Sequence, residues 1–202
     1  MQRTNMAGRA AASPIPPPPP AEPRITADEF MALPLELKSY ELVRGRLVEV
    51  PMTNYEHGEI EDNIMWLLNQ YVRPRRLGRV TPGDAKFRLA RDPDTLRMPD
   101  VAFVRADRLP PREQRRSYSP VVPDLAVEIL SPSNRSRDIA DKVAEYLRAG
   151  VRLVWVVDPV TETVTIHTSS AEPVTLSAND EIAGGVVLPD FRCPVAAFFE
   201  LA

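Results

Sequence analysis

Residues 151–158, VRLVWVVD, form the stretch that most restricts how this chain can fold. Its apolar side chains are consecutive, so a β-strand here presents apolar groups on both faces. Such a strand is typical of the centre of a sheet that is covered on both sides. The sequence therefore predicts an α/β protein in which helices pack against a mixed sheet.

Helical and strand patterns alternate along the rest of the chain. Two segments place apolar side chains at helical spacing, 55–72 and 136–150, the second with Ser136 as its expected N-cap and Gly150 as its expected stop. The other predicted elements are a short helix capped by Thr26, a hairpin over 40–51 with its turn at Arg44–Gly45, strands at 85–90, 98–106 and 124–130, two or three short strands after residue 159, and a last helical turn that begins at Pro194.

Residues 1–24 are rich in Ala and Pro and contain almost no large apolar residues. Such a segment cannot bury enough surface to fold, so we expect a disordered tail with a stiff polyproline stretch at PPPPP. Residues 25–202 are then expected to form a single domain. With 44% hydrophobic residues in the chain, a sizeable core is feasible.

Charge and cysteine content restrict the class of protein. The net charge of −3 gives no overall basic field of the kind that nucleic-acid binders often carry. Each arginine cluster taken alone, at 73–79 and at 111–116, is more commonly an ordinary solvated surface. The single Cys193 excludes an internal disulfide and a cysteine-based zinc cluster. No membrane-length apolar run and no secretory signal core are present, so we expect a cytoplasmic protein without membrane contact.

Glu128 lies among the apolar residues of one predicted strand. A carboxylate that is buried there is costly unless it is paired. Suppose that this strand pairs antiparallel with the one in MPDVAFV. A register with Asp100 opposite Glu128 also places Ala102 opposite Ala126. Opposed acids repel, and a divalent cation such as Mg²⁺ would remove that penalty. The small alanines would leave room for the ion and its waters.

Further polar residues surround this pair. Lys142 lies at the edge of the apolar face of the following helix, from which its long side chain can lean toward the sheet. Two acids that hold a metal and a lysine that orients water are typical of phosphodiester hydrolysis. His57 and Glu61 share one side of the earlier helix, and Glu41 lies in the hairpin, so each could support the metal. A histidine at the position of His57 is more often a helix-start or core residue than a metal ligand.

The same residues have ordinary structural interpretations. Glu128 could form an internal ion pair with an arginine such as Arg88 or Arg97. Asp100, after a proline, could be a turn carboxylate at the start of a strand. Lys142 could be a surface lysine that covers apolar area with its stem.

Several segments together resemble one family. YELVRGRLVEVP, HGEIEDNI, DAKFRL, DPDTLRMPDVAFV and PDLAVEILSPSNRSRDIADKVAEYLRAGVRLVWVVDP resemble the Uma-type family of putative restriction endonucleases, in the PD-(D/E)XK nuclease superfamily. The resemblance runs from about residue 25 to 200, and 123–159 is its most specific part. It implies a restriction-endonuclease-like αβββαβ core and DNA cleavage that depends on Mg²⁺, for which Mn²⁺ can substitute.

The resemblance also implies roles for individual residues. Asp100 matches the acid of the family's PD motif and Glu128 matches the second acid, so both are expected metal ligands, with Glu41 as a further ligand. The superfamily's lysine usually follows the second acid by two residues, where this chain has Leu130. We expect Lys142 to replace it.

The hypothesis is therefore a metal-dependent endodeoxyribonuclease that His57 supports from the first long helix. Arg135 and Arg137, with the basic segments 73–79 and 112–116, would contact the phosphate backbone of DNA. A homodimer would allow both strands to be cut. The alternatives are an inactive nuclease-fold module that binds DNA or a protein partner, and hydrolysis of RNA or another phosphodiester.

Overall fold

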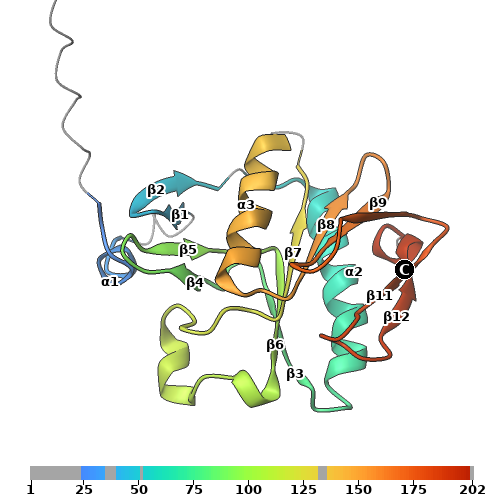
Figure 1. Cartoon of the computed structure of the whole chain (residues 1–202), viewed down its shortest axis with the longest axis horizontal. Coiled ribbons are helices and arrows are strands. Elements are labelled where there is room, and N and C mark those ends of the chain that lie inside the picture. The colour runs from blue at the N-terminus through green and yellow to red at the C-terminus, as the bar shows by residue number, and fades with distance from the viewer. Residues whose placement is uncertain (1–23, 35–39, 51, 132–135, 201–202) are drawn as a thin grey trace, which may run out of the picture.

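A six-stranded mixed sheet runs through the computed structural model, which describes residues 24–34, 40–50, 52–131 and 136–200 (Figure 1). Its strands in spatial order are β10 (Val174–Ser177), β9 (Thr163–His167), β8 (Leu153–Asp158), β7 (Leu125–Ile129), β6 (Val101–Arg105) and β3 (Gly78–Pro82). β7 and β8 are parallel, and the other neighbours are antiparallel. The predicted central strand is β8, whose first five residues are buried.

One long helix covers each face of this sheet. α2 (Tyr55–Val72) lies behind the sheet in Figure 1 and α3 (Ser136–Ala149) lies in front. Because side chains alternate along a strand, one set of strand residues packs against α2 and the other against α3. The α2 side holds the larger core, which includes Ile64, Leu68, Phe103, Val127 and Trp155. The α3 side holds Ala126, Val143, Tyr146, Val154 and Val156.

A second, four-stranded sheet flanks α3. Its order is β2 (Arg46–Glu49), β1 (Tyr40–Val43), β5 (Thr95–Arg97) and β4 (Phe87–Ala90). The predicted hairpin turn is confirmed, with positive φ at Arg44 and Gly45 as a tight two-residue turn requires. The predicted cap is confirmed too, since Thr26 and Glu29 form a capping box at the start of α1 (Ala27–Met31).

The remaining elements are short. They are β11 (Glu181–Ala183), β12 (Arg192–Pro194) and the 3₁₀ turns η2 (Ala106–Arg108), η3 (Arg112–Arg116) and η4 (Val195–Phe198). Four strands thus follow residue 159 in the part that the structure describes, one more than the upper limit of the prediction. β11 and β12 have only three residues each and so give little sequence signal. η4 begins after Pro194, as predicted.

The order α2–β3–β6–β7–α3–β8 is the predicted αβββαβ core, with β4 and β5 inserted between β3 and β6. The sequence patterns did not indicate β3, which contains Gly and Pro, or the three-residue β5. Ser136 is the first helical residue of α3 and not the residue before it, whereas Gly150 ends the helix with a φ of 96°. The predicted tail at 1–24 lies outside the described residues except for Arg24.

Within the described ranges, no helix combines the length and the apolar character needed to cross a membrane.

The close approach of β3 to β6 gives a test of the fold. A Cβ on Gly78 would lie 2.0 Å from the Val104 carbonyl oxygen and 2.7 Å from the Phe103 ring, so Gly78→Ala should lower the free energy of unfolding by about 2 kcal/mol or more. Gly58→Ala is the control: Gly58 is an exposed residue of α2 with open space around it, and alanine there should raise stability by about 0.5 kcal/mol. Urea unfolding measures both, and equal effects would contradict this packing.

Candidate active site

The two predicted acids meet where β6 begins and β7 ends. Ala102 pairs with Ala126, which is the register that the sequence predicts. Asp100 lies directly before β6, and its Oδ2 accepts a hydrogen bond of 2.6 Å from the backbone N–H of Ile129. That bond ties Asp100 to the end of the strand that carries Glu128.

Glu128 is buried in the middle of this pairing and has two donors from α3. Its Oε2 accepts from Lys142 Nζ at 2.9 Å, and its Oε1 accepts from the Tyr146 hydroxyl at 2.6 Å. The two donors are four residues apart and so lie on one helix face. Arg88 and Arg97, the partners that the ordinary interpretation suggested for Glu128, pair with other acids.

The charges around Glu128 oppose one another. Burial raises the pKa of Glu128, Lys142 lowers it, and the neighbouring acids Asp100 and Glu41 raise it again, so that the pKa lies above its ordinary value. Burial lowers the pKa of Lys142, but Glu128 and Glu41 outweigh burial and raise it. Lys142 therefore remains protonated near neutral pH.

Glu41 lies next to this pair and is held by a second set of donors. Its Oε2 accepts from Arg97 Nη1 at 2.7 Å, and its Oε1 accepts from the Met98 backbone N–H at 3.0 Å and lies 3.6 Å from Lys142 Nζ. Arg97 also donates to Glu145 of α3 at 2.6 Å. Arg97 thus connects β1 to α3 through a buried ion pair with Glu41 and a partly buried one with Glu145.

The N-terminal turns of α2 reach Asp100 from the other side. His57 is buried, and its Nε2 lies 3.3 Å from Asp100 Oδ1, an ionic contact without hydrogen-bond geometry. Burial lowers the pKa of His57, but the carboxylates of Asp100, Glu61 and Glu128 together raise it above its usual value. Glu61 accepts a hydrogen bond from the Gly83 backbone N–H at 3.1 Å, and burial raises its pKa.

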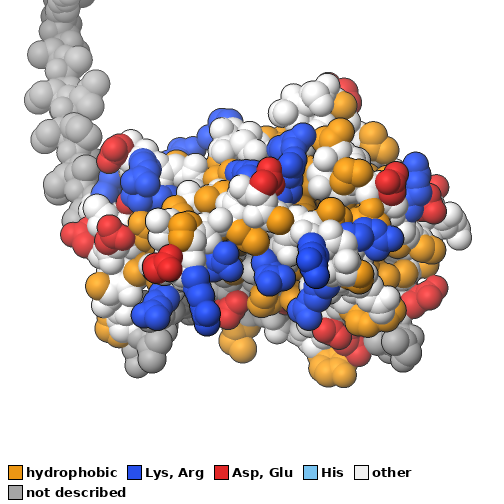
Figure 2. Space-filling model, turned by 90° about the horizontal axis from the view of Figure 1, so that it is seen from below, with side chains coloured by type: hydrophobic (Ala, Val, Ile, Leu, Met, Phe, Trp, Pro, Cys, Tyr) orange, Lys and Arg blue, Asp and Glu red, His pale blue; other side chains and the backbone are white. Residues whose placement is uncertain are grey.

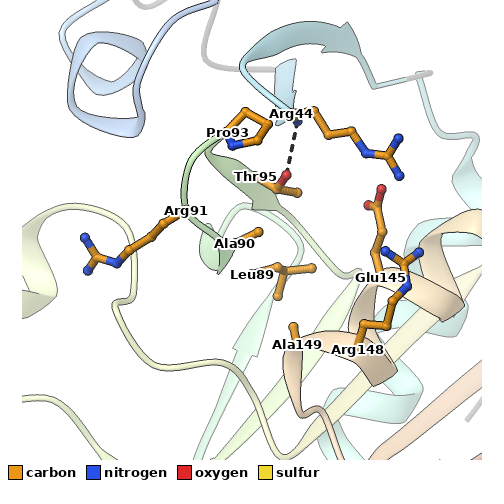
Figure 3. A pocket seen from close by; sticks show the side chains of 9 residues that line it. All are labelled: Arg44, Leu89, Ala90, Arg91, Pro93, Thr95, Glu145, Arg148 and Ala149. Atoms are coloured by element: carbon orange, nitrogen blue, oxygen red, sulfur yellow. Dashed lines mark hydrogen bonds between the residues drawn. The ribbon is translucent and has the colours of Figure 1, made fainter.

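A cleft of about 750 Å³ opens beside Lys142 and Glu41, between the β1–β2 hairpin and α3. A smaller cavity of about 230 Å³ shares Arg44, Glu145 and Arg148 with it. In Figure 3 the side chains of Arg44 and Arg148 extend toward Glu145, whereas Arg91 points away. Basic and acidic side chains both line the cleft, Lys142 and Glu41 among them.

The residues that the sequence predicts to contact the DNA backbone do not adjoin the two acids in the described part of the chain. Arg135 lies outside the described residues, and so does the side chain of Arg137. The basic segments lie at the far end of the central sheet, since Gly78 pairs with Arg105 at the end of β6 opposite to Asp100. At about 3.3 Å per residue, Asp100 and Arg105 are about 16 Å apart along the strand.

Sequence reasoning did not assign a role in the site to Tyr146, Arg97 or Glu145. The spacing of Lys142 and Tyr146 could have indicated that both side chains reach Glu128, but the tyrosine was interpreted only as part of the apolar face. No comparable signal existed for Arg97 and Glu145, which are 48 residues apart.

Comparisons with known proteins identify the family and agree with the fold. The Uma2 family model, described as "Putative restriction endonuclease", matches residues 27–196. Among solved structures, the chain resembles the crystal structure of a putative nuclease belonging to DUF820 from Anabaena variabilis ATCC 29413, with a TM-score of 0.76 and 22% sequence identity over 87% of this chain and 97% of that chain. At this identity the likeness shows the fold alone. No curated protein matches the chain.

The Glu128–Lys142 pair predicts a pH-dependent effect of Lys142→Met. Without Lys142 the pKa of Glu128 rises further, so the folded variant keeps a proton that the unfolded chain, with an ordinary glutamate pKa near 4.5, has released. Stability relative to wild type is then lost as pH rises through the raised pKa. We expect the variant to lose about 1 kcal/mol near pH 5 and about 3 kcal/mol near pH 8, measured by urea unfolding.

The double variant Glu128→Gln/Lys142→Met is the control. It removes the titrating group, so the difference from wild type should change far less with pH. A loss of the same size at both pH values in Lys142→Met would contradict the assigned pairing.

Proposed function

Because the chain belongs to the Uma2 family of putative restriction endonucleases, we propose that it is an endonuclease that hydrolyses phosphodiester bonds of DNA with the help of Mg²⁺. The observation that carries the proposal is the carboxylate pair Asp100 and Glu128 with Lys142 directly beside it. Membership in the family supports a nuclease that binds nucleic acid. DNA as the substrate and Mg²⁺ as the cofactor belong to the proposal.

The carboxylate pair fits an open Mg²⁺ site. Mg²⁺ is usually held by one or two carboxylates while it keeps several waters and takes up substrate phosphate oxygens. Among the described residues no three His, Cys, Asp or Glu side chains lie where they could hold one ion together. Asp100 and Glu128 each retain lone pairs beyond their present hydrogen bonds. Bound there, Mg²⁺ or Mn²⁺ would polarise the scissile phosphate and lower the pKa of a bound water.

Lys142 supplies a positive charge and not a base. Its raised pKa keeps the ammonium group protonated, and only some of its three donors are occupied by Glu128 and Glu41. The remaining donor can orient the attacking water or stabilise the charge that develops on the phosphate. Lys142 thus takes the place of the lysine that is absent at Leu130, a residue that packs against the core on the α3 side.

Two further residues position this group. His57 contacts Asp100 from α2 and, when protonated, favours the ionised carboxylate that a metal requires. Both oxygens of Glu41 are engaged by Arg97, Met98 and Lys142, which favours a role in fixing Lys142; its role as a third metal ligand stays a prediction. A homodimer would bring two such sites to the two strands of a duplex.

A plasmid-nicking assay with Mg²⁺, Mn²⁺ or EDTA tests the proposal. Wild type should nick supercoiled DNA only with metal, and Asp100→Asn and Glu128→Gln should each slow nicking by about a hundredfold or more, because each removes a charge that holds the metal. Asp62→Asn is the matched control, since Asp62 lies on the exposed side of α2 and should keep wild-type activity.

Equal residual nicking by wild type and both acid variants would refute the proposal. Metal-dependent cleavage of a labelled RNA but not of DNA would move the activity to RNA. Binding of DNA without cleavage under any metal would favour the non-enzymatic module, for which the direct Glu128–Lys142 ion pair already provides a stable resting arrangement.

A further inference from the structure

The end of the central sheet away from Asp100 and Glu128 is rich in arginine. Segments 73–79 and 105–116 contain nine arginines and two acidic residues, although the whole chain has a net charge of −3. Figure 2 shows this end of the molecule from below, with a band of Lys and Arg side chains across it and acids mostly toward its margins. Positive charge is therefore concentrated on one face of a weakly acidic protein.

The two segments form one surface. Gly78 pairs with Arg105, and the backbone N–H of Ala106 donates to the Leu77 carbonyl at 2.8 Å. Arg79 and Arg115 line the same cavity of about 320 Å³. We call this surface the arginine face, which comprises Arg73, Arg75, Arg76, Arg79, Arg105, Arg108, Arg112, Arg115 and Arg116.

The arginines of this face differ in whether they pair with an acidic side chain of the protein. Arg108 pairs with the buried Asp124 at 2.6 Å and so has a structural role. In contrast, four exposed members have neither an acidic partner nor a side-chain hydrogen bond within the described ranges; they are Arg76, Arg79, Arg112 and Arg116. Guanidinium groups without acidic partners remain available to an external anion.

The chemistry of the face favours a phosphate backbone over a membrane. Arginine binds phosphate oxygens in a bidentate manner, and several arginines in a row suit a polyanion. Proteins that dock on anionic lipid add exposed large apolar residues to the basic ones. None of the exposed large apolar side chains of the described chain lies in 73–79 or 105–116.

We propose that the arginine face is a second nucleic-acid docking surface, which holds the phosphate backbone at a place separate from the catalytic site. The choice of nucleic acid as the polyanion rests on the proposed function. Since Asp100 and Arg105 lie at opposite ends of β6, about 16 Å apart, the phosphate that is cleaved and those held by the face are different. The protein would thus hold phosphates that lie several nucleotides from the one it cleaves.

Fluorescence anisotropy with a labelled duplex of about 30 base pairs, in EDTA and over a range of salt, tests this surface on the full chain. Arg79→Glu/Arg116→Glu should raise the Kd about tenfold or more at low salt and reduce the slope of log Kd against log salt by about two. The control Arg91→Glu/Arg192→Glu makes the same charge change at exposed positions elsewhere and should alter the Kd less than about twofold.

Three results would overturn the inference. These are an equal loss of affinity in both double variants, no binding by wild type in EDTA, and binding to phosphatidylserine vesicles but not to the duplex. If Arg79→Glu/Arg116→Glu unfolds, Arg112→Gln/Arg116→Gln replaces it, with an expected fall of about two in the salt slope; no change would again overturn the inference. Duplex binding in EDTA by a protein that never nicks would count against the proposed function and leave this surface standing.

Discussion

Burial of the Glu128 carboxylate in β7 is the constraint on which the rest of the site depends. A carboxylate in a sheet interior is tolerated only when donors accompany it, and here Lys142 and Tyr146 reach it from one face of α3. The same contacts fix the position of α3 over the sheet. Burial of Glu128 in β7 therefore requires the donors that α3 carries, and the site is a part of the core.

Two further connections join other elements to this centre. Asp100 is attached to the end of β7 through the backbone of Ile129, and Arg97 links Glu41 of β1 to Glu145 of α3. Each connection crosses between elements that are distant in sequence. The acids are held close to one another by local hydrogen bonds and by nearby cations, so that their mutual repulsion is partly offset without a metal. A metal ion that binds between them would be favoured by the repulsion that remains.

Strand periodicity and helical spacing predict much of this arrangement. The two alanines Ala102 and Ala126 indicate the register that joins Asp100 to Glu128, because the side chains of a strand alternate. Four-residue spacing gives Lys142 and Tyr146 a common face, although the hydroxyl of Tyr146 is hidden within an apolar pattern. The Arg97 connections depend on how the β1–β2 hairpin docks, which local patterns do not encode. The sequence also did not indicate where the basic segments lie relative to the acids, since only the direction of β6 and its pairing with β3 place Arg105 at the end of the sheet away from Asp100.

The central claim is that Asp100 and Glu128 bind a divalent metal. The chain has two histidines at different distances from the acids: His57 contacts Asp100, whereas His167 lies on β9, two strands from β7 and two residues along the register from Glu128. Titration with Mn²⁺, followed by the NMR signals of the two imidazole rings, tests the claim directly, because the paramagnetic ion broadens the signals nearest to it. We expect the His57 signal to broaden first and to recover when excess Mg²⁺ is added, while the His167 signal broadens later and less. Equal broadening of both rings, or a sharp His57 signal at saturating Mn²⁺, would contradict the claim.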